Sequence, residues 1–383
     1  MPPILIDVTR LVGRAIKGRL PTGVDRVMLE YVRHYGADAR AVLHVRDQFR
    51  ALSASGSQRL FGHLLGAAGP ARKLLGLLLR DLPGSAGAAA VRGAVLLNLG
   101  HGNLHRASHQ RTLARHGIKP VYFIHDLIPI SHPEYCRAGE GALHAARMAH
   151  ALEYGAGIIA NSAATLAELA AFARQHGLRV PAAVVALLAP ATAPVVAAGR
   201  PLSAPYFVML GTIEARKNHW IILQAWRQLV QQLGQAAPKL VVIGQRGWEC
   251  EQVFDLLDRC AALRGAVIEM NSCGDDELAR YLRHAQALLF PSFAEGFGMP
   301  LVEALQMGTP VIASDLPAFR EIAGAVPDYL DPLDGTGWKR LVEAYCAGGN
   351  GPRADQLARL AGYRVPAWPA HFAAVDPLLE QLR

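Results

Sequence analysis

The chain has 383 residues, of which 51% are hydrophobic and 18% are charged. This balance excludes an intrinsically disordered protein and leaves room for two ordinary folded domains. Lysine and arginine number 39 against 31 aspartates and glutamates, a formal charge of +8, which suits an anionic partner but can also serve solubility alone. No basic run is interleaved with aromatic residues and no zinc-finger spacing occurs, so nucleic acid is disfavoured as a partner.

Short apolar segments alternate with longer helical patterns twice along the chain, which predicts parallel sheets flanked by helices. In the first half, the predicted strands are 4–8, 41–45, 95–99, 121–125, 157–160 and 183–187. The helices predicted between them are 25–35, 104–116, 139–154 and 163–176.

The stretch 189–205 is rich in proline and alanine and is the best candidate for an interdomain linker. After it, the predicted strands are 206–210, 240–243, 266–269, 287–290 and 310–313, and the predicted helices are 220–233, 250–262, 275–284, 300–307 and 337–347. The chain is therefore expected to be an α/β protein with two doubly wound, Rossmann-like domains. We expect them to face a central cleft at the carboxyl ends of their strands.

The stretch 58–90 contains two short apolar helices edged by Arg59, Arg72, Lys73 and Arg80. One interpretation is a helix that lies on a membrane surface. The other is that both are core helices of the first domain.

The cysteines and the first residues favour a reducing compartment. The five cysteines are scattered and lack Cys-x-x-Cys spacing, so we expect free thiols rather than disulfides or a metal site. The chain runs directly into the apolar segment 4–8 without a basic leader, and no apolar run reaches the roughly 18 residues of a membrane span. We therefore expect a cytoplasmic protein.

The segment 287–308 has the pattern of a strand, a loop and a helix that together suit an anionic ligand. Its apolar run ends in a loop that carries Glu295, Pro300 suits the first turn of a helix, and Glu303 follows about one turn later. A helix start offers free N–H groups and a positive dipole end to an anion. The two carboxylates would then bind hydroxyl groups on either side, as a diphosphate between two sugars requires. The alternative is a glycine-rich turn with solvated glutamates.

A second strand–loop–helix pattern carries two cations. The strand ends near Gly211, the loop presents Arg216 and Lys217, and a helix begins near Asn218. Two cations beside a helix start suit a diphosphate leaving group and would stabilise its charge as the glycosidic bond breaks. Taken alone, the same segment also fits a solvated basic turn capped by Asn218.

These two segments resemble the donor-binding motifs of retaining glycosyltransferases of family 4, which have the GT-B architecture. The resemblance rests on Glu295 and Glu303 within Phe-Ala-Glu-Gly-Phe-Gly-Met-Pro-Leu-Val-Glu and on the Arg-Lys-Asn triplet 216–218. It implies that Glu303 binds the ribose of the donor, that Glu295 contacts the donor sugar, and that the amides of 297–301 face the sugar and its phosphate. The full set of donor-binding residues expected is Gly23, Arg26, Gly211, Thr212, Arg216, Lys217, Gly244, Glu295, Gly296, Phe297, Gly298, Met299, Pro300, Leu301 and Glu303.

The first half carries two further motifs. His125 and Asp126 resemble the His-Asp element of mannosyl- and rhamnosyltransferases of the family, which implies that His125 binds a sugar hydroxyl through its imidazole or its carbonyl. A structural histidine at a strand end is the alternative. The segment 22–26 resembles a glycine-rich family loop, in which Gly23 would admit a phosphate or acceptor and Arg26 would pair with it. The loop 100–103 is a candidate to line the acceptor side.

The resemblance implies a retaining hexosyltransferase whose catalytic groups are His125, Asp126, Glu295, Lys217 and Arg216. The donor expected first is GDP-mannose and the second is dTDP-rhamnose, with a growing, lipid-linked cell-surface glycan such as lipopolysaccharide as acceptor. No cofactor or metal is implied beyond the nucleotide sugar. An anionic membrane surface is a further expected partner, on the inner face of the cytoplasmic membrane.

The domains expected are 1–195 on the acceptor side, 196–362 for the nucleotide sugar, and 363–383 as a helix that crosses back to the first domain. A sugar-nucleotide epimerase with the same two-domain form is the alternative. An oxidoreductase that uses a dinucleotide is disfavoured, because no Gly-x-Gly-x-x-Gly follows the first strand.

Overall fold

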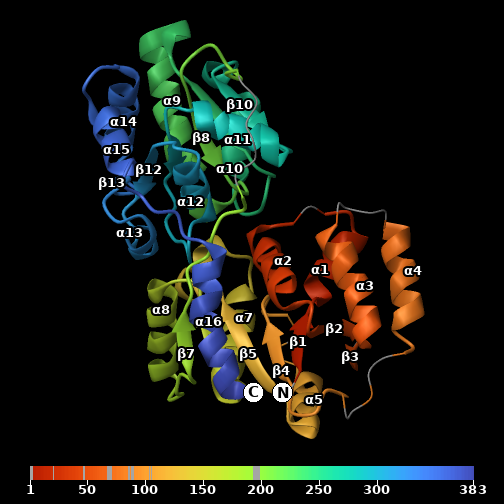
Figure 1. Cartoon of the computed structure of the whole chain (residues 1–383). Helices are drawn as coiled ribbons and strands as arrows, with labels where there is room; N and C mark the ends of the chain where they lie inside the picture. Colours follow the sequence, from red (N-terminus) through yellow and green to blue (C-terminus); the bar gives the residue numbers. More distant parts are fainter. Residues whose placement is uncertain are drawn as a thin grey trace. The chain divides into compact units, whose positions relative to one another are not determined.

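The computed structural model describes residues 3–19, 21–45, 48–66, 71–84, 87, 90–102, 104, 106–192 and 199–383. The chain forms two compact units, each with a sheet and helices beside it (Figure 1). The first unit comprises Met1–Leu127, Ala142–Leu188 and Trp368–Arg383, and the second comprises Ile128–Gly141 and Ala189–Ala367.

The sheet of the first unit has seven strands in the described residues, in the order β3-β2-β1-β4-β5-β6-β7. The strands are β1 (Ile4–Asp7), β2 (Ala39–Val45), β3 (Gln48–Ala51), β4 (Val95–Asn98), β5 (Lys119–Ile124), β6 (Gly157–Ala160) and β7 (Ala183–Val185). All pairs are parallel except β2 with β3, which is antiparallel at the edge. The sequence did not predict β3, because this short edge strand exposes polar side chains and lacks an apolar run.

The helices of this unit are α1 (Thr9–Ile16), α2 (Gly23–Tyr35), α3 (Ala54–Leu65), α4 (Ala71–Asp81), α5 (Ala107–His116), α7 (Glu140–Tyr154), α8 (Ala163–Gln175) and α16 (Trp368–Leu382). In the stretch with two interpretations, α3 and α4 each bury one side, with Leu60 and Leu74 in the core. Arg59 on α3 donates to both carboxylate oxygens of Asp81 on α4. The opposite side of α4 leaves Leu75 44% and Leu79 77% exposed.

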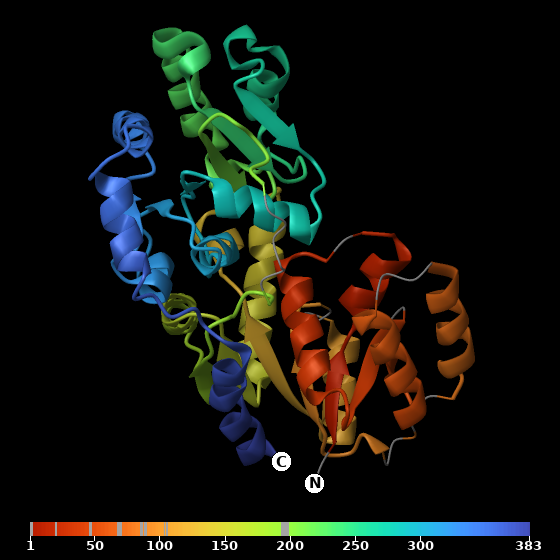
Figure 2. The same ribbon diagram turned by 45° about the horizontal axis from the view of Figure 1, so that its top comes forward.

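The last helix, α16, packs into the first unit and lies beside β7 in both views (Figures 1 and 2). His371 Nε2 lies 2.8 Å from the hydroxyl of Tyr31 on α2. The ring of Phe372 stacks on His34 with centroids 3.8 Å apart, and Tyr35 donates to Asp376 over 2.6 Å. These contacts make the final helix part of the first unit's core.

The sheet of the second unit has the order β10-β9-β8-β11-β12-β13, and all its strand pairs are parallel. Its strands are β8 (Tyr206–Leu210), β9 (Lys239–Ile243), β10 (Val267–Met270), β11 (Leu288–Phe290), β12 (Val311–Ser314) and β13 (Asp328–Leu330). Its helices are α6 (Ile128–Ser131), α9 (His219–Leu233), α10 (Glu251–Arg259), α11 (Asp275–His284), α12 (Met299–Gln306), α13 (Pro317–Ala323), α14 (Gly335–Cys346) and α15 (Pro352–Leu360).

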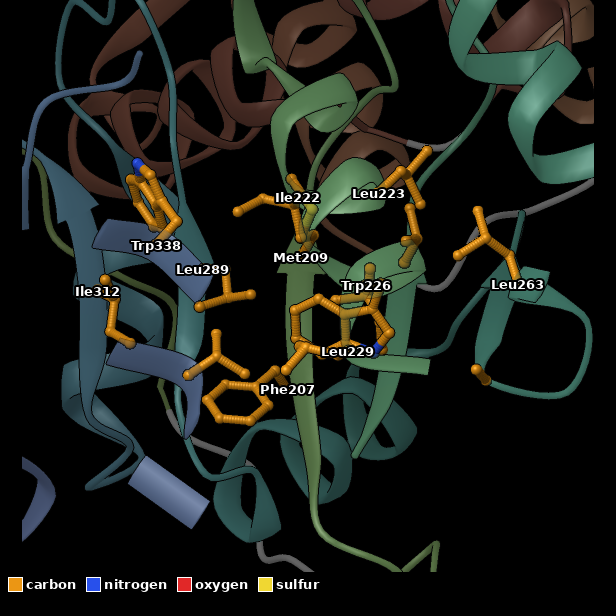
Figure 3. Packing of buried hydrophobic residues seen from close by; sticks show 14 of the residues in the cluster. Phe207, Met209, Ile222, Leu223, Trp226, Leu229, Leu263, Leu289, Ile312 and Trp338 are labelled. Atoms are coloured by element: carbon orange, nitrogen blue, oxygen red, sulfur yellow. The ribbon is translucent and has the colours of Figure 1, made fainter. Parts of the chain in front are cut away.

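The core of the second unit explains why its strands were visible as apolar runs. Trp226 of α9 and Trp338 of α14 are fully buried against the sheet, together with Phe207 of β8 (Figure 3). The indole N–H of Trp226 donates to the carbonyl of Pro238 over 2.9 Å, so its polar group is satisfied. Strands covered on both faces need apolar side chains at nearly every position.

The division of the chain differs from the predicted boundaries. The predicted limit at 195/196 falls outside the described residues, and the units divide after Leu188 because Ala191 already accepts a hydrogen bond from Gln306 on α12. Residues 128–141 belong to the second unit, where Tyr135 stacks on Phe293 with centroids 5.3 Å apart. The return to the first unit begins at Trp368 rather than at 363, since Tyr363 donates to Ile322 of α13.

The packing of α16 predicts a large effect of truncating Phe372, which is 4% exposed. Phe372→Ala should lower the free energy of unfolding by about 3 kcal/mol, because it removes ring contacts and leaves a cavity. Denaturant unfolding followed by circular dichroism measures the change. Leu79→Ala removes an exposed side chain of the same unit and should change stability by less than about 0.5 kcal/mol. Equal effects of the two substitutions would contradict the assignment of α16 to this core.

Candidate functional site

The two segments singled out in the second half meet at one edge of the sheet. β8 leads into the turn Ala215–Lys217, and β11 leads into the loop that carries Glu295. These two strands are parallel neighbours, so their carboxyl ends lie at the same edge. The amide of Phe293 donates to the carbonyl of Arg216 over 2.8 Å and joins the two loops directly.

The charges of these loops converge on the carboxylate of Glu295. Arg216 Nη1 lies 2.8 Å from Oε2, and Lys217 donates to Oε1. The hydroxyl of Ser292 also donates to Oε1 over 2.9 Å. On its other side, Arg216 Nη2 lies 2.6 Å from a carboxylate oxygen of Glu214. Two cations and two carboxylates therefore form one cluster, in which the side chains of Glu295 and Lys217 are only 8% and 9% exposed.

The cluster shifts the protonation of its members. Burial by itself would raise the pKa of Glu295, but the charges and hydrogen bonds of Arg216 and Lys217 outweigh it and lower the pKa to about 2. Burial lowers the pKa of Lys217, and the neighbouring Arg216 adds to this effect while Glu295 opposes it. Glu295 thus stays a carboxylate at any physiological pH. Next to the cluster, burial and the charge of Lys217 lower the pKa of His219 to about 3, so this imidazole is neutral.

Two glycines allow the loops after β8 and β9 to pass one another. A Cβ added at Gly244 would lie 1.9 Å from the carbonyl oxygen of Gly211, and one at Gly247 would lie 2.8 Å from that of Ile213. Gly211 itself has a φ of 133°, a conformation that side chains rarely adopt. A Cβ there would lie 3.8 Å from Nζ of Lys217. The glycines therefore set the close backbone approach beside the cations, and Thr212 is half-buried in the same loop.

The start of α12 offers fewer free backbone N–H groups than expected. Gly298 has a φ of 111°, and a Cβ there would lie 2.6 Å from the ring of Phe319. Of the predicted amides at 297–301, Pro300 has no N–H and Leu301 donates to the carbonyl of Gly298 over 3.0 Å. The prediction was wrong for these two residues, because the first turn closes on itself. The amides of Gly298 and Met299 remain at the helix start, where intrahelical partners are lacking.

The other predicted members of this site surround the same loop. Phe297 is buried beneath it, Gly296 and Met299 are half-buried, and Glu303 is half-buried on α12. Glu214 and Ser292 were missed by the sequence analysis. Their only sequence signal is proximity to Arg216 and Glu295, which does not distinguish them from solvated residues.

In the first unit, His125 and Asp126 follow the end of β5. His125 is 8% exposed, and its Nε2 lies 2.8 Å from the carbonyl oxygen of Leu99. Its own carbonyl accepts a hydrogen bond from Asn161 over 2.8 Å, so the imidazole rather than the carbonyl is available to a ligand. Burial lowers the pKa of His125. Asp126 is half-buried, and its carbonyl accepts from His144 Nε2 over 3.0 Å.

The start of α2 carries its own carboxylate. Asp25 is 1% exposed and accepts hydrogen bonds from the amide and the hydroxyl of Thr22 at 2.7 and 2.6 Å, which forms a capping box. Nε atoms of Arg10 and Arg14 each lie 2.8 Å from Asp25. Gly23 is exposed with nothing within 4 Å of an added Cβ, so packing does not require a glycine there. Arg26 is half-buried on the same helix.

The predicted residues thus fall into two groups, one in each unit. Gly23, Arg26, His125 and Asp126 belong to the first unit, and the others belong to the second. Within the described ranges, no three His, Cys, Asp or Glu side chains are arranged to hold a metal ion. No helix among the same residues is long and apolar enough to cross a membrane. Asn103 of the predicted acceptor loop lies outside the described residues.

Comparison with known proteins identifies the segment that carries the charge cluster. Residues 196–326 match the family described as glycosyl transferases, group 1. This segment is therefore similar to the group 1 glycosyltransferases. A serotype-specific mannosyltransferase, WbdA, of Escherichia coli is 37% identical over 121 residues, which are 32% of this chain and 15% of the relative. The O-antigen chain mannosyltransferase B of Escherichia coli is 33% identical over 129 residues, 34% of this chain and 33% of the relative. The matches thus span a third or less of these curated relatives.

The fold has solved counterparts over the whole chain. The structure of Anabaena HepE with UDP and glucose is similar with a TM-score of 0.66 at 14% identity, and the match covers 100% of this chain and 98% of that one. At this identity the likeness concerns the fold alone. Two parallel α/β sheets of this kind form the GT-B fold, as the sequence analysis predicted.

The lowered pKa of Glu295 leads to a prediction for stability. Because the pKa is about 2 in the folded protein and 4.5 without its partners, the carboxylate contributes stability above pH 4.5 that is lost as the pH falls towards 2. The contribution is about 3 kcal/mol by linkage. Glu295→Gln should therefore lower the free energy of unfolding more at pH 7 than at pH 3. Denaturant titrations of both proteins at the two pH values test this, and a difference that does not change with pH would contradict it.

Proposed function

We propose that this protein transfers a hexose from a nucleotide sugar to a hydroxyl of a glycan, with retention of the anomeric configuration. The observation that carries the proposal is the convergence of Arg216 and Lys217 on Glu295 beside the start of α12. Cations, a fixed carboxylate and free helix amides are the groups that a sugar diphosphate requires. Residues 196–326, which hold all of them, match a glycosyltransferase family.

Each member of the cluster has a defined task in this proposal. Lys217 has three N–H donors, of which Glu295 takes one, so its ammonium can also bind the diphosphate. Being almost fully buried, it would act on the developing charge with little screening. Glu295, fixed as a carboxylate, would accept hydrogen bonds from hydroxyls of the donor sugar. Glu303 would do the same for the ribose, and the amides of Gly298 and Met299 would face the phosphate.

In the chemical step, negative charge develops on the leaving diphosphate. The bond between the anomeric carbon and the diphosphate oxygen breaks, and the electron pair leaves with the nucleoside diphosphate held by Arg216 and Lys217. The acceptor hydroxyl forms the new bond on the same face and gives its proton to an oxygen of the leaving diphosphate. His125 and Asp126 lie in the first unit and would bind a sugar hydroxyl there. His125 is neutral and buried, and it would accept a hydroxyl hydrogen bond rather than act as the general base.

Mannose is the hexose we propose, with GDP-mannose as donor and dTDP-rhamnose as the second candidate. The named functions of WbdA and of the O-antigen chain mannosyltransferase B support mannose. The acceptor would be a growing cell-surface glycan that is attached to a lipid. The enzyme would act on it in the cytoplasm, at the inner face of the membrane.

A thermal-shift panel of nucleotide sugars tests the donor. GDP-mannose should raise the melting temperature more than dTDP-rhamnose or UDP-glucose, because stabilisation grows with affinity and concentration. Glu303→Ala should weaken that binding by about 1–3 kcal/mol through loss of a charged hydrogen bond. Glu321→Ala, which removes an exposed carboxylate of α13 in the same unit, should leave it unchanged. If no nucleotide sugar shifted the melting temperature, the proposal would be wrong.

The exposed side of α4 supports a membrane surface as a partner of the same enzyme. Leu75 and Leu79 lie one turn apart and are 44% and 77% exposed. The exposed cations Arg72, Lys73 and Arg80 lie on the same helix. A pocket of about 430 Å³ beside it is lined by His63, Lys73, Gly76, Leu77 and Arg80. Apolar side chains ringed by cations suit an anionic bilayer.

Vesicle flotation tests this surface. The wild-type protein should float with phosphatidylglycerol vesicles at low salt and much less with phosphatidylcholine, since salt and neutral lipid remove the attraction. A Leu75→Ser, Leu79→Ser variant should lose most of the binding. Leu333→Ser, at a leucine of the second unit that is 75% exposed, should keep it. Absence of binding at low salt would end this part of the proposal.

A further inference from the structure

Three histidines of the first unit cluster where β4, β5 and α7 meet. His101 follows β4, His125 follows β5 and His144 lies on α7. The ring centroid of His101 lies 5.5 Å from that of His125 and 5.3 Å from that of His144. Only His125 has a place in the chemistry proposed above. The other two lie close enough for one ligand to contact all three rings.

Backbone carbonyls fix the same tautomer in all three rings. Nε2 of His101, His125 and His144 lies 2.7, 2.8 and 3.0 Å from the carbonyl oxygens of Phe123, Leu99 and Asp126. A carbonyl only accepts, so each Nε2 carries a hydrogen and donates it. In a neutral ring with that tautomer, Nδ1 is a hydrogen-bond acceptor. The cluster therefore presents acceptors and no further donors.

The three acceptors are open to a ligand. Some ring nitrogens of the described residues are both buried and without a hydrogen-bond partner, such as Nδ1 of His109 and of His219. The Nδ1 atoms of the three clustered histidines do not belong to that group. Since no hydrogen bond within the described residues engages these Nδ1 atoms, solvent reaches them. His125 and His144 are otherwise 8% and 5% exposed. Each ring therefore keeps one polar atom available to a ligand, although those of His125 and His144 are nearly buried.

His101 is held in a strained conformation that supports a functional role. Its φ is 56°, in the left-handed region that costs a non-glycine residue roughly 1 kcal/mol or more. It lies between Gly100 and Gly102, either of which adopts that region more readily. The strained residue is thus the one that brings a third imidazole to the cluster.

The rings of His101 and His125 are uncharged at neutral pH. Burial lowers the pKa of His101 well below its ordinary value, and the neighbouring His125, His144 and Arg147 lower it further. Burial also lowers the pKa of His125, against the opposing effects of Asp126 and Asp25 and in the same direction as Arg10. Neutral acceptors attract hydroxyl groups, whereas the ionised oxygens of a phosphate bring lone pairs and charge without a hydrogen to donate.

The adjacent start of α2 already holds an anionic side chain. The carboxylate of Asp25 accepts hydrogen bonds from Thr22 at the helix start and from Arg10, and it forms an ion pair with Arg14. Arg10 also reaches the histidine loop, because its Cδ would lie 3.2 Å from a Cβ at Gly100. A phosphate at this helix start would therefore have to compete with the Asp25 carboxylate for these donors and cations.

We infer that the first unit binds an uncharged, hydroxyl-rich sugar as the acceptor, with Nδ1 of His101, His125 and His144 accepting its hydroxyl hydrogens and Asp25 excluding phosphate from the start of α2. The inference rests on the proposed function in taking the ligand to be a sugar. It changes the expectation for Gly23 and Arg26, since a phosphate-bearing acceptor group is excluded at that helix start. His101 and His144 become determinants of acceptor specificity.

Saturation-transfer NMR on the full chain with methyl α-D-mannoside tests the inference. His101→Gly removes one imidazole and relieves the positive φ, so it should fold. It should weaken mannoside binding about threefold to tenfold, the value of one hydrogen bond. His116→Ala, at a half-buried histidine of α5 outside the cluster, is the matched control and should bind as the wild type does. Mannose 6-phosphate should bind no more tightly than the mannoside, and Asp25→Asn should shift this preference towards the phosphate.

Two outcomes would overturn the inference. One is unchanged mannoside binding by His101→Gly, and the other is displacement of the mannoside from the wild type by inorganic phosphate. If Asp25→Asn does not fold, His101→Gly decides alone. The thermal shift by GDP-mannose is measured on the same variants and should not change in His101→Gly. Mannoside binding without any nucleotide binding would refute the proposed function and leave this inference standing, and the converse result would do the opposite.

Discussion

The interaction on which the second unit depends is the buried carboxylate of Glu295 between Arg216 and Lys217. Removing charges from water costs several kcal/mol per ion, and only close partners offset the cost. Here Glu214 and Ser292 complete the cluster, so that each carboxylate has a cation and the basic pair has two anions. The cluster also joins the loops after β8 and β11, which meet in addition through hydrogen bonds from the Phe293 amide to the Arg216 carbonyl and from Arg216 Nη1 to the Ala294 carbonyl. A change in any one charge should therefore move both loops.

The topology of each sheet explains where the chemical groups lie. In the order β10-β9-β8-β11-β12-β13, the chain first builds outward from β8 on one side and then resumes on the other. After β8 the chain continues to one side of the sheet, and after β11 it continues to the other. In open α/β sheets a crevice forms at such a switch point. The first unit repeats the arrangement between β1 and β4. Arg10 follows β1 and His101 follows β4. The proposed acceptor site therefore lies at the switch point of the first sheet, as the charge cluster does in the second.

Much of this could be predicted from the sequence, because strands buried on both faces show as apolar runs and parallel neighbours bring their ends together. That logic places Arg216, Lys217 and Glu295 at one edge without any coordinates. It does not reveal Glu214 as a partner, since nothing local marks a glutamate as buried. The transfer of residues 128–141 to the second unit depends on the stack of Tyr135 on Phe293, a contact between residues far apart in the chain. The capping box of Thr22 and Asp25 is a different case. Its spacing is visible in the sequence, but the segment was interpreted only as resembling a glycine-rich family loop.

The site residues of the second unit are charged, whereas His101 and His125, proposed for the first unit, are neutral. In the proposed function, the charge of a sugar diphosphate binds to the second unit. Carboxylates there hold the cations in place beforehand, which limits reorganisation when charge moves in the reaction. An acceptor needs no such field if it is neutral, and the first unit accordingly offers the imidazoles of His101 and His125, which are uncharged. If those rings were protonated, their positive charge would raise the affinity of the acceptor site for the donor diphosphate. Burial of His101 and His125 keeps them neutral and so assigns each substrate to its own unit.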